Sequence, residues 1–112
     1  MASRKEYLDL VLDQLSALDG IRSRAMMEEY LLYCQGKVIG GVYDDRLLLK
    51  PTPTALRLLR ENGLEIQMER PYDGAKEMLL MDVDRRELLV TIVQAVADEM
   101  PEAKEKKRSK TR

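Results

Sequence analysis

The stretch AMMEEYLLYCQGKVIGGVYDDRLLLKPT, residues 25–52, decides the fold because it reads as a series of short strands. Its apolar segments, divided by turn residues, lie at residues 25–27, 30–34, 37–43 and 46–50. The separators Gln35-Gly36 and Asp44-Asp45 are about two residues long, which suits hairpins, whereas parallel strands need a long crossover. We therefore expect an antiparallel meander of three or four strands.

A helix is predicted before this meander. Ser3 and Glu6 have the spacing of a capping box, and Asp19-Gly20 supplies a stop. Between these signals apolar residues recur at helical intervals, at Tyr7, Leu8, Val11, Leu12, Leu15 and Leu18.

The second half of the chain predicts a short helix, two strands and a last helix. Thr52 or Thr54 can cap the short helix, which carries Leu56, Leu58 and Leu59 and ends at Asn62-Gly63. Strands are expected at residues 64–68 and 76–81, joined by the turn-rich segment 71–74. Asp84 and Glu87 repeat the capping-box spacing, and Pro101 ends the helix that they open.

This order predicts a two-layer α+β domain, an antiparallel sheet with three helices in the order α-β(3 to 4)-α-β(2)-α. The folded domain is expected at residues 1–101. Residues 102–112 are expected to form a basic disordered tail, because KEKKRSKTR at 104–112 has no apolar residue to bury.

Composition points to one aliphatic core in a reducing compartment. The 112 residues suit a single domain, and Phe and Trp are absent. Cys34 is the single cysteine, so no intramolecular disulfide can form. No apolar run has the length of a membrane span, and no export signal is present in the sequence. A cytoplasmic location without a membrane partner is expected.

The net charge of −1 divides unevenly between body and tail. Residues 1–103 hold 13 Lys/Arg against 19 Asp/Glu, whereas residues 104–112 hold 6 against 1. Two interpretations of the tail are open, a solubilising disordered end and weak, non-specific contact with nucleic-acid phosphates. Its basic side chains are Lys104, Lys106, Lys107, Arg108, Lys110 and Arg112.

The sequence predicts no catalytic, cofactor-binding or metal-binding residues. Histidine is absent, which removes the usual general base and the commonest metal ligand. Cys34 is interpreted as a small apolar residue of a strand, and Gly40-Gly41 as a bulge or close backbone approach. Asp44-Asp45 and Asp82/Asp84 are interpreted as turn and cap residues, since no oxygen-rich loop surrounds them.

Methionine and tyrosine leave two alternatives open. Met26-Met27 and Met78/Met81 are expected to fill the core, the alternative being an adaptable binding groove. Tyr30 and Tyr33 should point to opposite faces of a strand. Among these two and Tyr43, at least one exposed interaction anchor is expected.

The segment at residues 25–52, together with PYDGAKEMLLMDV at residues 71–83, resembles the N-terminal domain of the TfoX family of competence-regulator-like proteins. The resemblance covers about residues 3–99 and includes the leading YLDLVLDQLSALDG. It implies a compact α+β domain similar to secretion-chaperone-like folds. Glu28 departs from it, because members more often have glycine there. Longer members also carry a C-terminal domain where this sequence has its basic tail.

The resemblance offers no catalytic residues and implies a non-enzymatic regulatory or binding domain that acts on transcription through a protein partner. The first alternative is a nucleic-acid-associated protein that uses the tail, and the second is an enzyme. A homodimer is also expected, because a sheet edge can pair with a second copy. A binding domain needs an exposed apolar patch or an open edge, whereas an enzyme needs a pocket with perturbed titratable groups.

Overall fold

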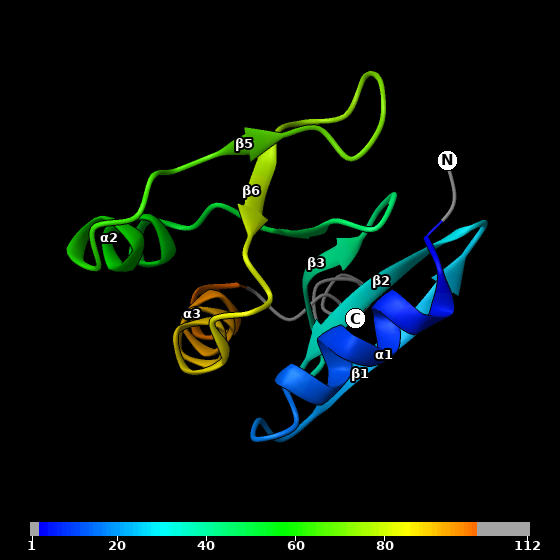
Figure 1. The fold of residues 1–112 in the computed structure, drawn as a ribbon, viewed down its shortest axis with the longest axis horizontal. Helices are drawn as coiled ribbons and strands as arrows, with labels where there is room; N and C mark the ends of the chain where they lie inside the picture. Colours follow the sequence, from blue (N-terminus) through cyan, green and yellow to red (C-terminus); the bar gives the residue numbers. More distant parts are fainter. Residues whose placement is uncertain (1–2, 101–112) are drawn as a thin grey trace, which may run out of the picture.

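A computed structural model describes residues 3–100 and shows an α+β domain with one six-stranded antiparallel sheet (Figure 1). The strand order is β1-β2-β3-β4-β6-β5. The predicted class and order of elements are confirmed. The elements are α1 (Lys5–Gln14), β1 (Ile21–Met26), β2 (Glu29–Cys34), β3 (Lys37–Val42), β4 (Leu47–Leu49), α2 (Pro53–Glu61), β5 (Met68–Glu69), β6 (Met78–Met81) and α3 (Arg86–Glu99).

The core lies between the three helices and one face of the sheet, and it is aliphatic as expected. Alternate residues of the strands point into it, as Leu32 and Cys34 of β2 and Leu47 and Leu49 of β4 do. The helices contribute Val11, Leu59, Leu89, Ile92, Val93 and Val96. The residues between, such as Leu31 and Leu48, lie on the opposite face. We call this face, which lies away from the main core, the open face, although Leu48 is itself buried there.

Two hairpins form at the predicted separators. Gln35 and Gly36 both have positive φ between β2 and β3, and Asp44 and Asp45 both have positive φ between β3 and β4. Successive positive φ angles twist a two-residue turn in the same sense as the flanking strands. Between β1 and β2 the left-handed residue is Met27, so this turn is made by a residue with a side chain.

Gly40 marks a bulge and a close approach of two strands. The pairing of β2 with β3 shifts between Leu32 and Tyr33, so that Ile39 has no opposite residue. A Cβ atom on Gly40 would overlap the carbonyl oxygen of Leu48 in the neighbouring strand. The structural interpretation of this glycine is therefore confirmed.

Several element boundaries differ from the prediction: α1 ends at Gln14, before the expected Asp19-Gly20 stop, and two strands differ most. The first strand begins at Ile21 rather than residue 25, and only Met68–Glu69 of the expected strand at 64–68 pairs with a neighbour. Residues 22–26 are exposed, so no apolar alternation marks the start of β1. Leu64 and Ile66 pack against the core although they lie in an irregular segment. An apolar side chain can be buried without its backbone pairing with a neighbouring strand.

The capping predictions hold for one helix. Thr52 caps α2, its side chain accepting a hydrogen bond from the N–H of Ala55 at 3.3 Å. The two capping boxes are wrong: Arg4 and Arg85 occupy the N-cap positions of α1 and α3, and neither side chain makes a capping bond. The Ser3 hydroxyl instead bonds to Glu29 at the start of β2 and to Asp45 in the β3–β4 turn, and Asp82 accepts from the N–H of Asp84 at 2.9 Å.

Candidate functional site

Exposed apolar side chains gather at the end of the sheet where the β1–β2 and β3–β4 turns meet. Met27 is 94% exposed, Tyr72 63% and Met26 37%. They border an open groove of about 1120 Å³, which we call the hairpin-end groove. Its lining residues are Met26, Met27, Glu28, Glu29, Tyr43, Asp44, Arg46, Pro71, Tyr72 and Asp73.

The walls of this groove come from three segments and are tied together. Tyr43, after β3, and Tyr72, in the loop between β5 and β6, stack edge to face with ring centroids 6.4 Å apart. Arg46 donates to a carboxylate oxygen of Glu69 at 2.6 Å and to the carbonyl oxygen of Tyr43 at 3.1 Å. It also reaches the carbonyl oxygen of Pro71, which fixes the loop against the turn.

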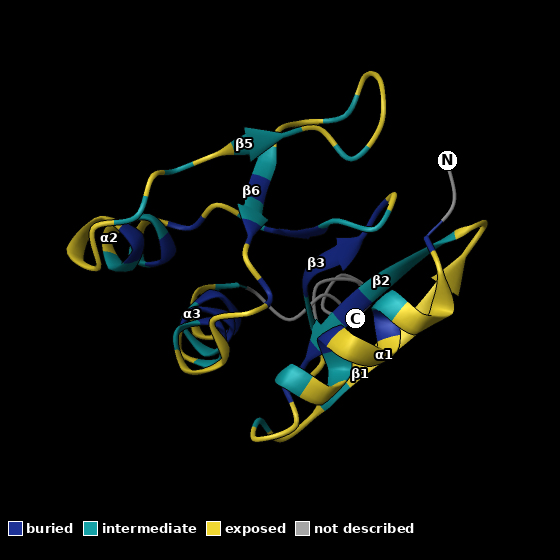
Figure 2. Cartoon of the chain, in the orientation of Figure 1, coloured by how far each residue is buried: buried dark blue, intermediate teal, exposed yellow. Residues whose placement is uncertain are grey.

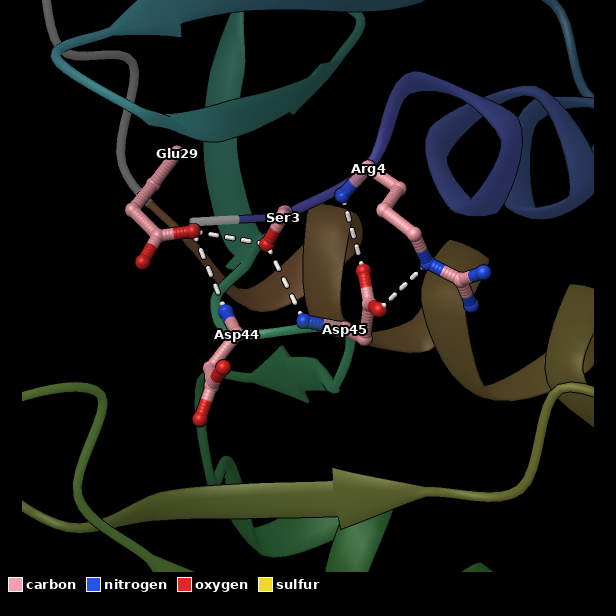
Figure 3. Close-up of polar contacts among 5 residues, drawn as sticks. All are labelled: Ser3, Arg4, Glu29, Asp44 and Asp45. Atoms are coloured by element: carbon pink, nitrogen blue, oxygen red, sulfur yellow. Dashed lines mark hydrogen bonds and ion pairs between the residues drawn. The ribbon is translucent and has the colours of Figure 1, made fainter. Parts of the chain in front are cut away.

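Hydrogen bonds from Ser3, Arg4 and Glu29 stabilise the β3–β4 turn (Figure 3). The Ser3 hydroxyl donates to Oε1 of Glu29 at 2.6 Å and accepts from the N–H of Asp45 at 3.1 Å. The N–H of Asp44 also donates to Oε1 of Glu29, at 3.1 Å. Arg4 donates to both carboxylate oxygens of Asp45, through its N–H at 2.8 Å and its Nε at 2.7 Å.

These bonds stabilise a turn that is otherwise unfavourable. Asp44 and Asp45 of this turn both adopt left-handed backbone conformations, which aspartate tolerates better than most residues but which remain unfavourable. Met27 of the β1–β2 turn is also left-handed. The hydrogen bonds from Arg4 hold the pKa of Asp45 below its usual range. Such strained residues persist where surrounding contacts fix them, and they concentrate at binding sites.

The groove is acidic around its apolar centre. The lining includes four acidic residues, Glu28, Glu29, Asp44 and Asp73, and one basic residue, Arg46, whose guanidinium already binds Glu69. Burial, followed by the neighbouring Tyr72 and Glu29, raises the pKa of Tyr43, so its phenol stays neutral. The lining therefore offers thioether and aromatic surface inside a negatively charged rim.

The described residues contain no cluster of three or more potential metal ligands. A smaller cavity of about 310 Å³ lies between α2, β6 and α3, with leucine walls and the polar side chains of Glu65, Asp82 and Arg85. Within residues 3–100, no helix is both long and apolar enough to cross a membrane.

The predicted site residues fall in different places. Cys34 is fully buried, and burial, with Asp98 adding to it, raises the pKa of its thiol. Asp44 and Asp45 form the expected turn. The predicted nucleic-acid contacts, Lys104, Lys106, Lys107, Arg108, Lys110 and Arg112, lie outside the described residues.

Two expectations about methionine and tyrosine need correction. Met81 is buried as expected, but Met78 is only half-buried and lies outside the core, because strand alternation turns it away from Leu79 and Met81. Met26 and Met27 are exposed, because Met27 is a turn residue and Met26 lies on the open face with Arg24. Tyr30 packs against the core whereas Tyr33 does not, so they take opposite faces as predicted. Neither these two nor Tyr43 is exposed. The exposed tyrosine is Tyr72, whose place among turn residues gave no sign of an anchor.

Sequence reasoning did not find the polar residues that shape the groove. Ser3, Arg4 and Glu29 carry no periodic signal, and Arg46 meets Glu69 from 23 positions away. The one available signal was Asp44-Asp45, since a two-residue turn without glycine requires outside support.

Comparison with known proteins adds two findings. A family model described as the TfoX N-terminal domain matches residues 13–98. An uncharacterized 12.7 kDa protein in the trpE 5' region of Spirochaeta aurantia is 32% identical over 109 residues, which cover 96% of this chain and 91% of that protein.

Proposed function

Because the chain belongs to the TfoX N-terminal domain family, we propose that it is a non-enzymatic regulatory domain that binds a protein partner in the hairpin-end groove. The observation that carries this proposal is the gathering of Met26, Met27 and Tyr72, all exposed, around one groove. Exposed apolar surface with a polar rim is typical of protein interaction sites. Aromatic and methionine side chains are also enriched at such interfaces.

The groove's chemistry specifies the occupant as a segment with an aliphatic side chain flanked by lysine or arginine. The aliphatic side chain contacts Met27 and Tyr72, and the flanking cations face the carboxylates of Glu28, Asp44 and Asp73. Methionine is flexible and polarisable, so it can adapt to aliphatic groups of different shapes. Charge complementarity at the rim selects the partner and speeds its association.

The groove is largely preformed, which favours binding. The Tyr43–Tyr72 stack and the bonds of Arg46 hold the loop, while Ser3 and Arg4 hold the β3–β4 turn. A rigid site loses less conformational entropy when it binds than a mobile one does. The partner therefore meets a surface already close to its bound shape.

A peptide titration tests the proposal. The probe is a short fluorescent peptide with leucines flanked by lysines, and its matched control has glutamate in place of each lysine. We expect the lysine peptide alone to bind, and the double substitution Met27→Ala with Tyr72→Ala to weaken it by about tenfold or more, since truncated anchors often cost over 1.4 kcal/mol. Leu10→Ala, another exposed hydrophobic position, is the control variant.

Equal affinity for the lysine and glutamate peptides, together with an affinity that the groove substitutions do not change, would refute this site. The regulatory step is tested separately in the native cell, where the double variant should reproduce the transcript changes caused by deleting the gene. A double variant whose transcripts match the wild type would contradict regulation through the groove.

A further inference from the structure

Within residues 3–100, the sheet has one long edge strand with no strand paired on its outer side. The order of strands puts β1 and β5 at the two edges, and β5 pairs over only Met68–Glu69. β1 pairs with β2 along all six of its residues, and residues 22–26 are exposed (Figure 2). Its outer N–H and C=O groups therefore form a template on which another strand can pair.

The side chains of β1 give this edge a definite charge. Arg22 and Arg24 lie opposite Tyr33 and Leu31 of β2, both on the open face. Neither arginine forms an ion pair within residues 3–100. The carboxylate of Glu29, diagonal to Arg24, binds Ser3 and the Asp44 N–H instead. The helix-side face of β1 carries the small residues Ser23 and Ala25.

We propose that β1 binds an extended acidic segment of a partner protein, which adds a strand to the sheet and places carboxylates beside Arg22 and Arg24. Strands that bind in this way gain affinity from main-chain hydrogen bonds and specificity from alternate side chains. Carboxylates at every second position fall on the open face, where arginine can bind them with two parallel hydrogen bonds. The intervening side chains lie beside Ser23 and Ala25, which leave them room.

The same arginines disfavour a second copy at this edge. Among the antiparallel self-pairings that keep the two faces continuous, those centred on Ser23 and on Arg24 pair the largest part of β1. The first register sets Arg22 opposite Arg24 of the other copy, and the second sets the two Arg24 side chains opposite each other. Like charges directly opposite destabilise a strand pair. An acidic segment turns both repulsions into attractions.

This inference does not depend on the groove, because the edge and the groove select opposite charges. An acidic segment on β1 and a cationic segment in the groove can belong to one partner or to two. A negative result with the peptide that probes one surface leaves the proposal for the other surface unaffected, because each surface has its own probe.

The experiment uses the full chain and a fluorescent peptide in which glutamate and valine alternate, with a lysine-valine peptide as control. We expect saturable binding of the glutamate peptide that weakens with salt, and new hydrogen-exchange protection confined to amides of β1. The double substitution Arg22→Glu with Arg24→Glu should weaken binding by about tenfold or more. Arg22→Gln with Arg24→Gln should give an intermediate loss.

The control substitutions are Arg60→Glu with Arg85→Glu, which make the same charge change at exposed arginines on α2 and before α3. They should leave binding unchanged, as should Met27→Ala with Tyr72→Ala. Circular dichroism verifies that each variant folds.

Several results would overturn the inference. These are equal binding of both peptides, unchanged binding by the Arg22/Arg24 variants, or protection away from β1. Concentration-dependent protection of β1 in the free protein would assign the edge to a second copy. Arginine-dependent binding of an RNA oligonucleotide without binding of the glutamate peptide would assign it to nucleic acid.

Discussion

Arg4 binds Asp45 twice across 41 positions of sequence, through its backbone N–H at 2.8 Å and its Nε at 2.7 Å. This pair connects the start of α1 to the β3–β4 turn, which forms one wall of the hairpin-end groove. The shape of the groove therefore depends on the N-terminal segment as well as on the sheet.

The first prediction is that Asp45 makes the domain sensitive to acid. Its pKa is lowered in the folded protein, so its contribution to stability is present above the unfolded value of about 3.9 and is lost as pH falls through the folded pKa. Asp45→Asn keeps a residue that tolerates the left-handed backbone but removes the charge. The melting temperatures of wild type and variant should differ at pH 6 and converge in acid, where a constant difference would refute the prediction.

The second prediction concerns the close approach of β3 and β4 at Gly40. Gly40→Ala should lower the free energy of unfolding by at least about 1–3 kcal/mol, because the new Cβ overlaps the backbone oxygen of Leu48. Gly36→Ala is the comparison, since its Cβ would meet no atom within 4 Å and its cost comes from the left-handed backbone alone. Urea titration measures both variants, and a smaller loss for Gly40→Ala than for Gly36→Ala would contradict this account.

The third prediction is that Cys34 is a structural residue. The buried thiol has a raised pKa, so a thiol reagent should label the native protein slowly at neutral pH and rapidly once it unfolds. Cys34→Ser should lower stability by about 0.5–3 kcal/mol and leave partner binding unchanged. Rapid labelling of the folded protein near pH 6 would instead indicate a reactive thiolate.

The fourth prediction is that Met27 lowers the stability of the folded domain but strengthens binding in the groove. Its positive φ of 60° disfavours any side chain, so Met27→Gly should raise the free energy of unfolding by up to about 1 kcal/mol. The same change removes an exposed anchor and should weaken the lysine-leucine peptide. Thermal melting and peptide titration of one preparation test both effects, and a less stable variant would show that this turn stores no strain.

Local signals in the sequence predicted the fold well, because turn chemistry and apolar spacing act between near neighbours. Gln35-Gly36 and Asp44-Asp45 located two hairpins, and Thr52 located the start of α2. The start of β1 was missed because residues 22–26 are exposed and lack apolar alternation.

The candidate site was less predictable, because its contacts join residues that are distant in sequence. The pairs Arg4–Asp45 and Arg46–Glu69 bridge separate segments, and surface polar residues leave no periodic pattern. Met26 and Met27 were expected in the core, since their type favours burial, but Met27 lies in the β1–β2 turn and Met26 lies on the open face of β1. Only the folded chain shows that they lie beside Tyr72.

The most direct test of the central claim is the affinity of the lysine-leucine peptide for the wild-type domain and for Met27→Ala with Tyr72→Ala, measured by calorimetric titration. We expect saturable binding to the wild type, weakened by about tenfold or more in the double variant and unchanged in Leu10→Ala. Leu10→Ala should melt close to the wild type, whereas the double variant should melt slightly lower because Tyr72→Ala removes the edge-to-face stack on Tyr43. Equal affinity for all three, or tighter binding of the glutamate control peptide, would contradict partner binding in the hairpin-end groove.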